Sequence, residues 1–215
     1  MLKIGVLIPT RGDRPQLLKF AMKQLERQTL QPDEILIVDY PPVGLQPDIR
    51  DRYAKGYAQL EKLGCDLVFF WEDDDWYATN YLERMMSQYI SFGSPPIFGI
   101  NSTIYYHLKK KTWMKMQHVS RASMMSTIMR TGLNPRWEKY HEKFCDIDLW
   151  REFKGLSVPF ETICLGIKHG TGICGGIGHN SQWKGYNHDD PDGIFLNTIV
   201  GDEDYKFYQS LWKKN

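Results

Sequence analysis

The first hundred residues alternate between two hydrophobic patterns. Continuous apolar runs are typical of strands that are covered on both faces, and they occupy residues 3–9, 34–39 and 66–71. Between them, apolar residues recur every three or four positions, which predicts helices. These helices are expected from Pro15 to before Pro32, from Ile49 to Leu63, and from about residue 80 to Ser91. Strands that alternate with helices predict an α/β fold with a mostly parallel central sheet.

The pattern changes after Pro95 and Pro96. Two strand-like stretches flank the turn Lys109–Lys111, which predicts a β-hairpin. The remaining expected elements are strands at 122–129 and 158–168, a short helix at 145–153 and a Gly-rich loop at 170–178. Neither a repeat nor a low-complexity linker divides the chain. We therefore expect one domain over residues 1–215, with an irregular C-terminal part.

Composition narrows the protein class. Of 215 residues, 42% are hydrophobic and 25% charged, which is typical of a globular domain. The apolar runs are far shorter than the roughly 18 residues of a spanning helix, and the N-terminus lacks a signal-peptide pattern, so we expect no integral membrane segment and a cytoplasmic location. The four cysteines form no CxxC pair, which favours reduced, buried thiols over a disulfide framework or zinc ribbon.

The formal net charge of +1 hides an uneven distribution. Residues 101–143 contain nine Lys and Arg against two Asp and Glu, whereas acidic residues predominate on both sides of this segment. Such a basic segment is able to face an anionic partner such as a phosphate or a nucleic acid. An ordinary solvated face explains the same pattern, and both interpretations stay open.

Four consecutive acids, Glu72-Asp73-Asp74-Asp75, follow the third strand directly. Their mutual repulsion at the end of a buried strand is costly unless a cation or strong donors offset it. The carboxyl ends of parallel strands are also where ligands bind in open α/β sheets. Hard oxygen ligands favour Mg²⁺ or Mn²⁺. The alternative is an acidic turn in which Asp75 or Thr79 caps the next helix.

The first and second predicted strands also end in residues that are able to bind a ligand, and parallel strands place these ends at the same edge of the sheet. Pro9-Thr10-Arg11 follows the first strand, and Asp39, which closes the second, can accept hydrogen bonds from a nucleobase or ribose. Among the basic residues of the second helix, Arg50, Arg52 and Lys55 are candidates for phosphate contacts, although helix surface explains them equally well.

The stretches IGVLIPTRGDRPQLLKFAMKQLERQTLQPDEILIVDY and DLVFFWEDDDWY resemble the nucleotide-binding half of GT-A glycosyltransferases, specifically the large family-2 type of inverting enzymes. The resemblance covers roughly residues 3–90. It implies a Rossmann-like GT-A fold in which residues 1–100 bind the nucleotide sugar and residues 101–215 bind the acceptor. Asp73-Asp74-Asp75 matches the DxD motif of this family.

Carried over by position, the resemblance implies site residues. It assigns the nucleotide sugar to Pro9, Thr10, Arg11, Asp39, Arg52, Asp73 and Asp74. As the outer acids of DxD, Asp73 and Asp75 are expected near the ribose and on the metal. The family's Arg-Asn-x-Gly element is only approximated, by Arg52 and Gly56.

The segment CDIDLW at 145–150 resembles the family's Glu-Asp-x-Asp-Leu-Trp segment, whose second acid serves as catalytic base. By this match the base is Asp146, with Asp148 as its competitor. Cys145 stands where the family has Glu. Capping of the short helix by either aspartate is the structural alternative.

The tract from His169 to Asn180 contains a formal GxGxxG pattern, but no helical periodicity follows it, which argues against a dinucleotide fingerprint. In GT-A enzymes a late histidine often supplies a further metal ligand. The resemblance therefore makes His169 the first candidate for that role and His179 the second.

Together these features predict a metal-dependent inverting glycosyltransferase that uses Mn²⁺ or Mg²⁺ and a nucleotide-diphosphate sugar. The acceptor is expected to be a saccharide or, because aromatic and basic residues mix over Tyr105–His118, a modified base in DNA of the phage type. The alternatives are a nucleotidyltransferase or pyrophosphorylase, and a non-catalytic module that binds nucleotide sugar or nucleic acid. Donor sugar, nucleobase and oligomeric state are not encoded in any recognisable pattern.

Overall fold

The computed structural model describes residues 2–41, 48–170 and 185–212. Its main sheet has six strands, in the order β2 (Glu34–Val38), β1 (Ile4–Pro9), β3 (Leu67–Phe70), β8 (Thr127–Arg130), β5 (Ile97–Ile100) and β9 (Leu156–Val158). Only β8 runs against its neighbours. The predicted α/β fold class with a mostly parallel central sheet is confirmed.

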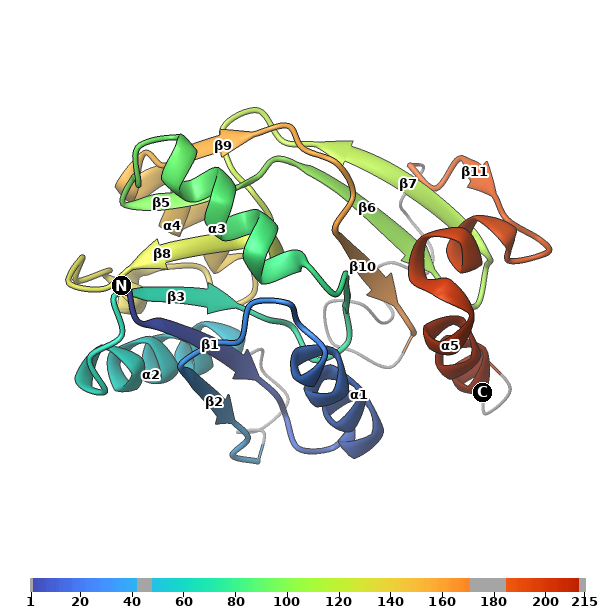
Figure 1. Cartoon of the computed structure of the whole chain (residues 1–215), viewed down its shortest axis with the longest axis horizontal. Coiled ribbons are helices and arrows are strands. Elements are labelled where there is room, and N and C mark those ends of the chain that lie inside the picture. The colour runs from blue at the N-terminus through green and yellow to red at the C-terminus, as the bar shows by residue number, and fades with distance from the viewer. Residues whose placement is uncertain (1, 42–47, 171–184, 213–215) are drawn as a thin grey trace.

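A second, five-stranded sheet lies beside the first (Figure 1). Its order is β11 (His188–Asp189), β7 (Thr112–Gln117), β6 (Ser102–His107), β10 (Cys164–Lys168) and β4 (Trp76–Tyr77). Strands β6 and β7 pair antiparallel from Ser102 and Gln117 to His107 and Thr112, which confirms the predicted hairpin. At its turn Lys111 adopts a positive φ of 51°.

The described helices pack on the two sheets. They are α1 (Pro15–Glu26), α2 (Ile49–Lys62), α3 (Tyr81–Ser91), α4 (Cys145–Phe153) and α5 (Ile194–Trp212), with 3-10 turns at Met124–Ser126 and Trp137–Lys139. Helices α1 to α4 pack on the main sheet, and α5 packs on the second sheet. Apolar residues of α1 and α3 pack in one core, and those of α2 and α4 in another. Among the described residues, every helix is too short or too polar to cross a bilayer.

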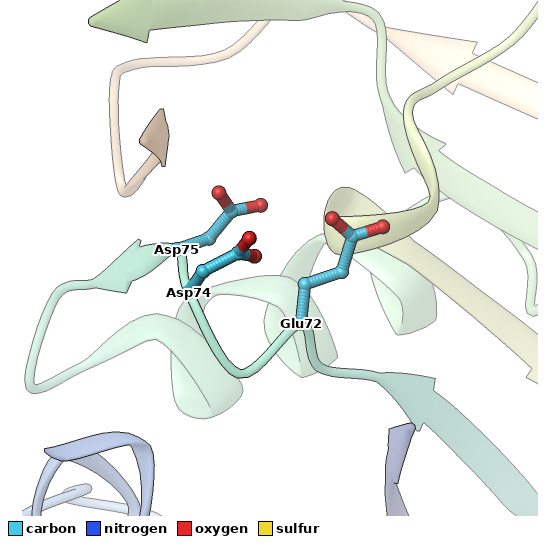
Figure 2. A group of neighbouring side chains, drawn as sticks. All are labelled: Glu72, Asp74 and Asp75. Atoms are coloured by element: carbon cyan, nitrogen blue, oxygen red, sulfur yellow. The ribbon is translucent and has the colours of Figure 1, made fainter. Parts of the chain in front are cut away.

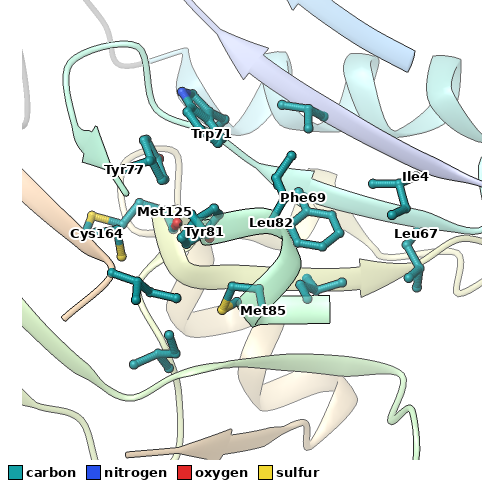
Figure 3. Packing of buried hydrophobic residues seen from close by; sticks show 14 of the residues in the cluster. Ile4, Leu67, Phe69, Trp71, Tyr77, Tyr81, Leu82, Met85, Met125 and Cys164 are labelled. Atoms are coloured by element: carbon teal, nitrogen blue, oxygen red, sulfur yellow. Dashed lines mark hydrogen bonds between the residues drawn. The ribbon is translucent and has the colours of Figure 1, made fainter. Parts of the chain in front are cut away.

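The first of these cores extends to the edge of the sheet at which β3 ends. Trp71 and Tyr77 stack with ring centroids 3.7 Å apart, and Tyr81 of α3 meets both rings edge-on (Figure 3). Tyr81 also donates its hydroxyl to the carbonyl of Met125 at 2.7 Å. The acidic residues that follow Trp71 therefore start from a rigid aromatic base. Cys65, Cys145 and Cys164 are buried free thiols, as expected, and Cys174 lies outside the described residues.

Two stretches predicted as single strands are each divided between the sheets. The run from Ile97 ends in β5, and the chain crosses at Asn101 into β6. Likewise, the run from Val158 closes β9 before β10 begins at Cys164. The backbone N–H of Asn101 donates to the carbonyl of Val158 at 3.0 Å, so both crossings meet at one point. Hydrophobic pattern does not mark such crossings, because apolar side chains are buried in either sheet.

The strand predicted at 122–129 was wrong in its first half. Residues 124–126 form a 3-10 turn instead. The carbonyl of Ser123 accepts hydrogen bonds from the hydroxyls of Ser126 and Thr127, at 3.2 and 2.8 Å. These local bonds compete with strand pairing, which begins only at Thr127.

The C-terminal part, expected to be irregular, also contains α5. Its helical pattern is interrupted at Gly201, whose φ of 79° is not helical. Asp204 accepts hydrogen bonds from Arg27 and from the indole of Trp76, and Phe207 stacks on Phe20 at 3.8 Å between centroids. Helix α5 is thus held against α1 and the second sheet.

The contact between α2 and β1 generates a stability prediction. A Cβ at Gly56 would lie 2.1 Å from Cδ1 of the fully buried Leu7. Gly56→Ala should therefore lower the free energy of unfolding by about 1–3 kcal/mol, despite the better helix propensity of alanine. Chemical denaturation measures this, with Gln59→Ala on the exposed face of the same helix as control. Equal stability of Gly56→Ala and wild type would contradict the packing.

Candidate active site

A cavity of about 240 Å³ opens beyond the carboxyl ends of β1 and β3. One part of its wall comes from the β1–α1 loop and the acidic loop 72–75. Another part comprises Met116, Arg121, Ser123–Met125 and Lys143–Asp146. Because the family resemblance assigns residues 101–215 to the acceptor, we call this part the acceptor wall. The cavity lies at the edge of the sheet where the sequence predicted ligand binding.

Three acids of the loop bring carboxylate oxygens to within 4.8 Å of one another (Figure 2). They are Glu72, Asp74 and Asp75. Asp75 is 1% exposed, and its Oδ1 accepts a hydrogen bond from the amide of Ile167 at 2.8 Å. Its Oδ2 is buried and has no hydrogen-bond partner among the described residues. An unsatisfied buried carboxylate oxygen is costly, and a bound cation would satisfy it.

The loop is held in this shape by Gln24, a fully buried residue of α1. Its side-chain amide donates to the carbonyl of Asp75 at 3.0 Å and accepts from the amide of Tyr77 at 2.7 Å. The hydroxyl of Tyr77 in turn accepts the amide of Glu72 at 2.8 Å. Both ends of the acidic loop are therefore fixed by side chains from the core.

Burial changes the proton affinity of the acids. It raises the pKa of Glu72 to about 7, and the nearby Asp74 charge contributes in the same direction. Burial also holds the pKa of Asp75 well above its ordinary value. Both carboxyls therefore bind protons more tightly than exposed acids do, and a cation would compete with those protons.

Arg14 pairs with the two central acids. Its guanidinium donates to Oδ1 of Asp73 at 2.7 Å and to Oδ2 of Asp74 at 3.0 Å. Burial opposes ionisation of Asp74, but Arg14 and His169, whose Nε2 lies 2.9 Å from Oδ2, hold its pKa below the ordinary value. His169 thus lies beside the three-acid group and contacts one of its members.

Asp73 is bound by two neighbouring side chains, and its role in the DxD resemblance stays a prediction. Its Oδ2 accepts the hydroxyl of Thr10 at 2.6 Å, and Arg14 occupies Oδ1. It is not among the three acids that converge. Glu72, which the resemblance assigned no role, takes part in the group instead.

Lys168 is a further cation of the site that sequence reasoning missed. It is buried at the end of β10, lines the cavity, and its Nζ lies 5.0 Å from the ring centroid of Tyr105. Burial lowers its pKa, but the charges of Asp75 and Asp74 outweigh this and raise it. A lysine that closes an otherwise apolar strand was the only signal in the sequence. The signal for Arg14 was similar, because Arg14 is a cation that follows the first strand closely.

Asp146 lies in the first turn of α4 and lines the cavity. Its Oδ2 accepts a hydrogen bond from Nη1 of Arg121 at 2.5 Å. Burial raises its pKa, and Arg121 partly opposes this. Asp148 is not among the lining residues; its carboxylate accepts the amide of His141 and a hydrogen bond from Arg151, at 2.8 and 2.9 Å.

The remaining predicted nucleotide residues are placed as follows. Pro9, Thr10, Arg11 and Arg52 line the cavity, and Asp39 is exposed just after β2, outside the lining set. Arg52 is only 1% exposed. Its guanidinium donates to the carbonyls of Thr10 and Val38 and to Asp48, and so braces the ends of β1 and β2. His179 lies outside the described residues.

Comparison with known proteins bears on the fold. Neither the protein-family models nor the curated proteins contain a match. Among solved structures, the chain is similar to A197 from STIV, with 12% identity, 75% of this chain and 82% of that chain covered, and a TM-score of 0.50. It is also similar to S. aureus TarS 1-349 in complex with UDP, with 12% identity, 77% and 60% covered, and a TM-score of 0.48. At such identity the likeness to A197 concerns the fold alone.

The aromatic residues of the hairpin do not form an outward stacking face. Tyr106 is fully buried, and Trp113 stacks on His188 and on Phe195, with centroids 4.1 and 4.0 Å apart. The exposed side chains of the turn are the lysines 109 and 110. Tyr105, by contrast, is half-buried and lines the cavity, so the hairpin presents one aromatic ring to the site among these three.

A buried polar cluster supports the acceptor wall. The hydroxyl of Ser123 lies 3.2 Å from that of Thr103, 2.8 Å from that of Tyr105 and 3.2 Å from Nε2 of His118. Burial lowers the pKa of His118 to about 4, and Arg121 contributes in the same direction. The imidazole is therefore neutral in the folded protein at neutral pH.

This shift predicts a pH dependence of stability. An unfolded histidine titrates near pH 6.5, so between pH 6.5 and 4 the unfolded state binds the extra proton and folding is weakened as pH falls. The cost should reach about 3 kcal/mol at pH 4. His118→Gln, which keeps a side-chain hydrogen-bonding group, should flatten this part of the curve. Urea denaturation at several pH values measures it, and parallel curves for variant and wild type would contradict the assignment.

Proposed function

We propose that the protein is a metal-dependent inverting glycosyltransferase of GT-A type, which moves a sugar from a nucleotide-diphosphate sugar to an acceptor hydroxyl. The observation that carries this proposal is a single cavity with two kinds of carboxylate. One wall presents the converging acids Glu72, Asp74 and Asp75, and the acceptor wall presents Asp146. The first set suits a cation with a diphosphate, and the second suits a proton acceptor.

The converging acids fit a divalent cation. All their donors are hard oxygens, and the buried Oδ2 of Asp75 lacks any other partner among the described residues. Glu72, Asp74 and Asp75 would hold Mg²⁺ or Mn²⁺, with His169 beside Asp74. When bound, such an ion offsets the negative charge of the departing nucleoside diphosphate.

The chain itself binds and orients the donor. Pro9, Thr10 and Arg11 end β1 at the cavity, and we assign them to the nucleotide together with Asp39 at the end of β2. Asp73 keeps Arg14 and Thr10 in place through hydrogen bonds. Arg52 fixes the strand ends from behind, so its contribution to nucleotide binding is mainly one of position.

Asp146 acts as the catalytic base. Its raised pKa favours proton uptake, and it lines the cavity, whereas Asp148 is already occupied by His141 and Arg151. Asp146 takes the proton of the acceptor hydroxyl while that oxygen attacks the anomeric carbon. The bond from that carbon to the diphosphate oxygen breaks in the same displacement, and the configuration inverts.

Asp75 gives the first functional test. Asp75→Asn keeps the side-chain volume but removes the negative charge of a carboxylate whose Oδ2 has no hydrogen-bond partner among the described residues. The cooperative binding of Mn²⁺ and nucleoside diphosphate, measured by calorimetry, should weaken by at least about 100-fold. Asp192→Asn, an exposed residue near α5, serves as control. Undiminished cooperativity in Asp75→Asn would remove the metal assignment.

Asp146 gives the second test. Asp146→Asn should leave nucleotide binding close to the wild-type value, because the residue lies on the acceptor wall. Sugar transfer should fall about 1,000-fold, which is typical of the loss of a general base. Initial rates and nucleotide affinity measured in parallel separate the two effects. Full transfer by Asp146→Asn with loss in Asp148→Asn would move the base to Asp148.

A further inference from the structure

The acceptor wall carries more positive than negative charge. Arg121 and Lys143 both line the cavity there, and Asp146 is the one carboxylate among the residues of this wall. The wall also includes the start of α4, where backbone N–H groups and the helix dipole add positive potential. This surplus concerns the acceptor, so the inference below rests on the proposed glycosyltransferase function.

Arg121 has unused hydrogen-bonding capacity. Its Nη1 donates to Asp146 and, at 3.4 Å, to the carbonyl of Ala122. Within the described part of the chain, its Nε and Nη2 have no hydrogen-bond partner. The side chain is 26% exposed, so these donors remain open to a ligand in the cavity. A guanidinium with two free donors is suited to a phosphate, which it binds in bidentate fashion.

Lys143 provides a second positive charge without a carboxylate partner. Within residues 2–41, 48–170 and 185–212, no Asp or Glu lies within 4.0 Å of its ammonium, which stands 5.3 Å from the ring centroid of Phe144. Phe144 is 47% exposed and lines the cavity, so its ring is accessible to a ligand there. Such a ring can pack against the apolar face of a saccharide.

We propose that the acceptor is a saccharide that carries a phosphate ester close to the attacking hydroxyl. Arg121 and Lys143 bind the phosphate, Phe144 packs against the sugar, and the hydroxyl lies at Asp146. A nucleic acid also carries phosphate, but it would need stacking partners for several bases. Of the hairpin aromatics Tyr105, Tyr106 and Trp113, only Tyr105 lines the cavity, whereas Tyr106 is buried and Trp113 stacks on His188 and Phe195. The phosphorylated saccharide is therefore the better match.

This arrangement makes acceptor binding prepare the base. In the structure Arg121 occupies Oδ2 of Asp146. A phosphate that draws the guanidinium towards itself loosens this ion pair and leaves the carboxylate to accept the hydroxyl proton. The proton then moves to Asp146, the acceptor oxygen bonds to the anomeric carbon, and the electron pair of the broken bond leaves with the nucleoside diphosphate.

The test compares matched acceptors on the full chain. Ligand-observed NMR measures the affinities of two pairs of sugars: glucose and glucose 6-phosphate, and N-acetylglucosamine and its 6-phosphate. A single-stranded DNA oligonucleotide is measured in the same way as a third ligand. The phosphorylated member should bind at least about tenfold more tightly. Lys143→Gln and Arg121→Gln should each remove most of this preference, and Arg121→Lys should restore part of it. Lys139→Gln, an exposed lysine outside the cavity, is the matched control.

Each outcome has one meaning. Equal affinity for both members of each pair, or a preference that survives Lys143→Gln and Arg121→Gln, overturns the phosphate assignment. Tighter binding of DNA than of either phosphorylated sugar overturns the saccharide assignment. Binding of UDP-sugars and GDP-sugars with Mn²⁺ is measured in the same samples. If the nucleotide sugar binds but the phosphorylated sugars are not preferred, only this inference is wrong. If no nucleotide sugar binds, the proposed function is wrong.

Discussion

The structure around the cavity depends on the neutralisation of four consecutive carboxylates in a largely buried loop. Burial alone would drive protons onto them, and it does raise the pKa of Glu72 and Asp75. The fold supplies two fixed cations, Arg14 from the start of α1 and Lys168 from the end of β10. Arg14 caps α1, which packs on the main sheet, whereas Lys168 belongs to the second sheet. The acidic loop therefore links the two sheets electrostatically. With all four acids ionised, these two cations leave two negative charges, so the loop needs either bound protons or a divalent ion.

The junction between the two sheets determines what the cavity can contain. The chain crosses from one sheet to the other at Asn101 and again after Val158, and these crossings are hydrogen-bonded to each other. They deliver Tyr105 on β6 and Lys168 on β10 to the cavity that is also lined by the acidic loop 72–75 after β3. A single sheet would present only the strand ends and their loops. The second sheet closes the site from another direction, and helix α5, anchored through Asp204, supports that sheet from outside.

The sequence predicted the elements of residues 1–100 well, because buried parallel strands and amphipathic helices leave strong periodic signals. It predicted α4 to the residue. The sheet crossings, the 3-10 turn before Thr127 and helix α5 were not predicted, since Ser–backbone hydrogen bonds and a kink at Gly201 carry no clear pattern. For the cavity, the local sequence indicated the acidic cluster, and the family resemblance indicated Asp146, which lines the cavity. The local sequence did not reveal Arg14, Lys168 or Arg121 as partners, because those pairings join residues that are distant in sequence.

Opposite charge on two parts of one cavity imposes different conditions on its two ligands. Under the proposed function, the diphosphate of the donor would meet net negative charge near the acidic loop until a cation is bound, so donor affinity and cation affinity would be coupled. Near Arg121 and Lys143 the positive charge is built into the chain and needs no cation. Recognition on that wall should therefore be independent of the metal. Because the two charge requirements are independent, the proposed function allows either ligand to bind first. Sugar transfer then requires both the cation-bound donor and the acceptor in the cavity.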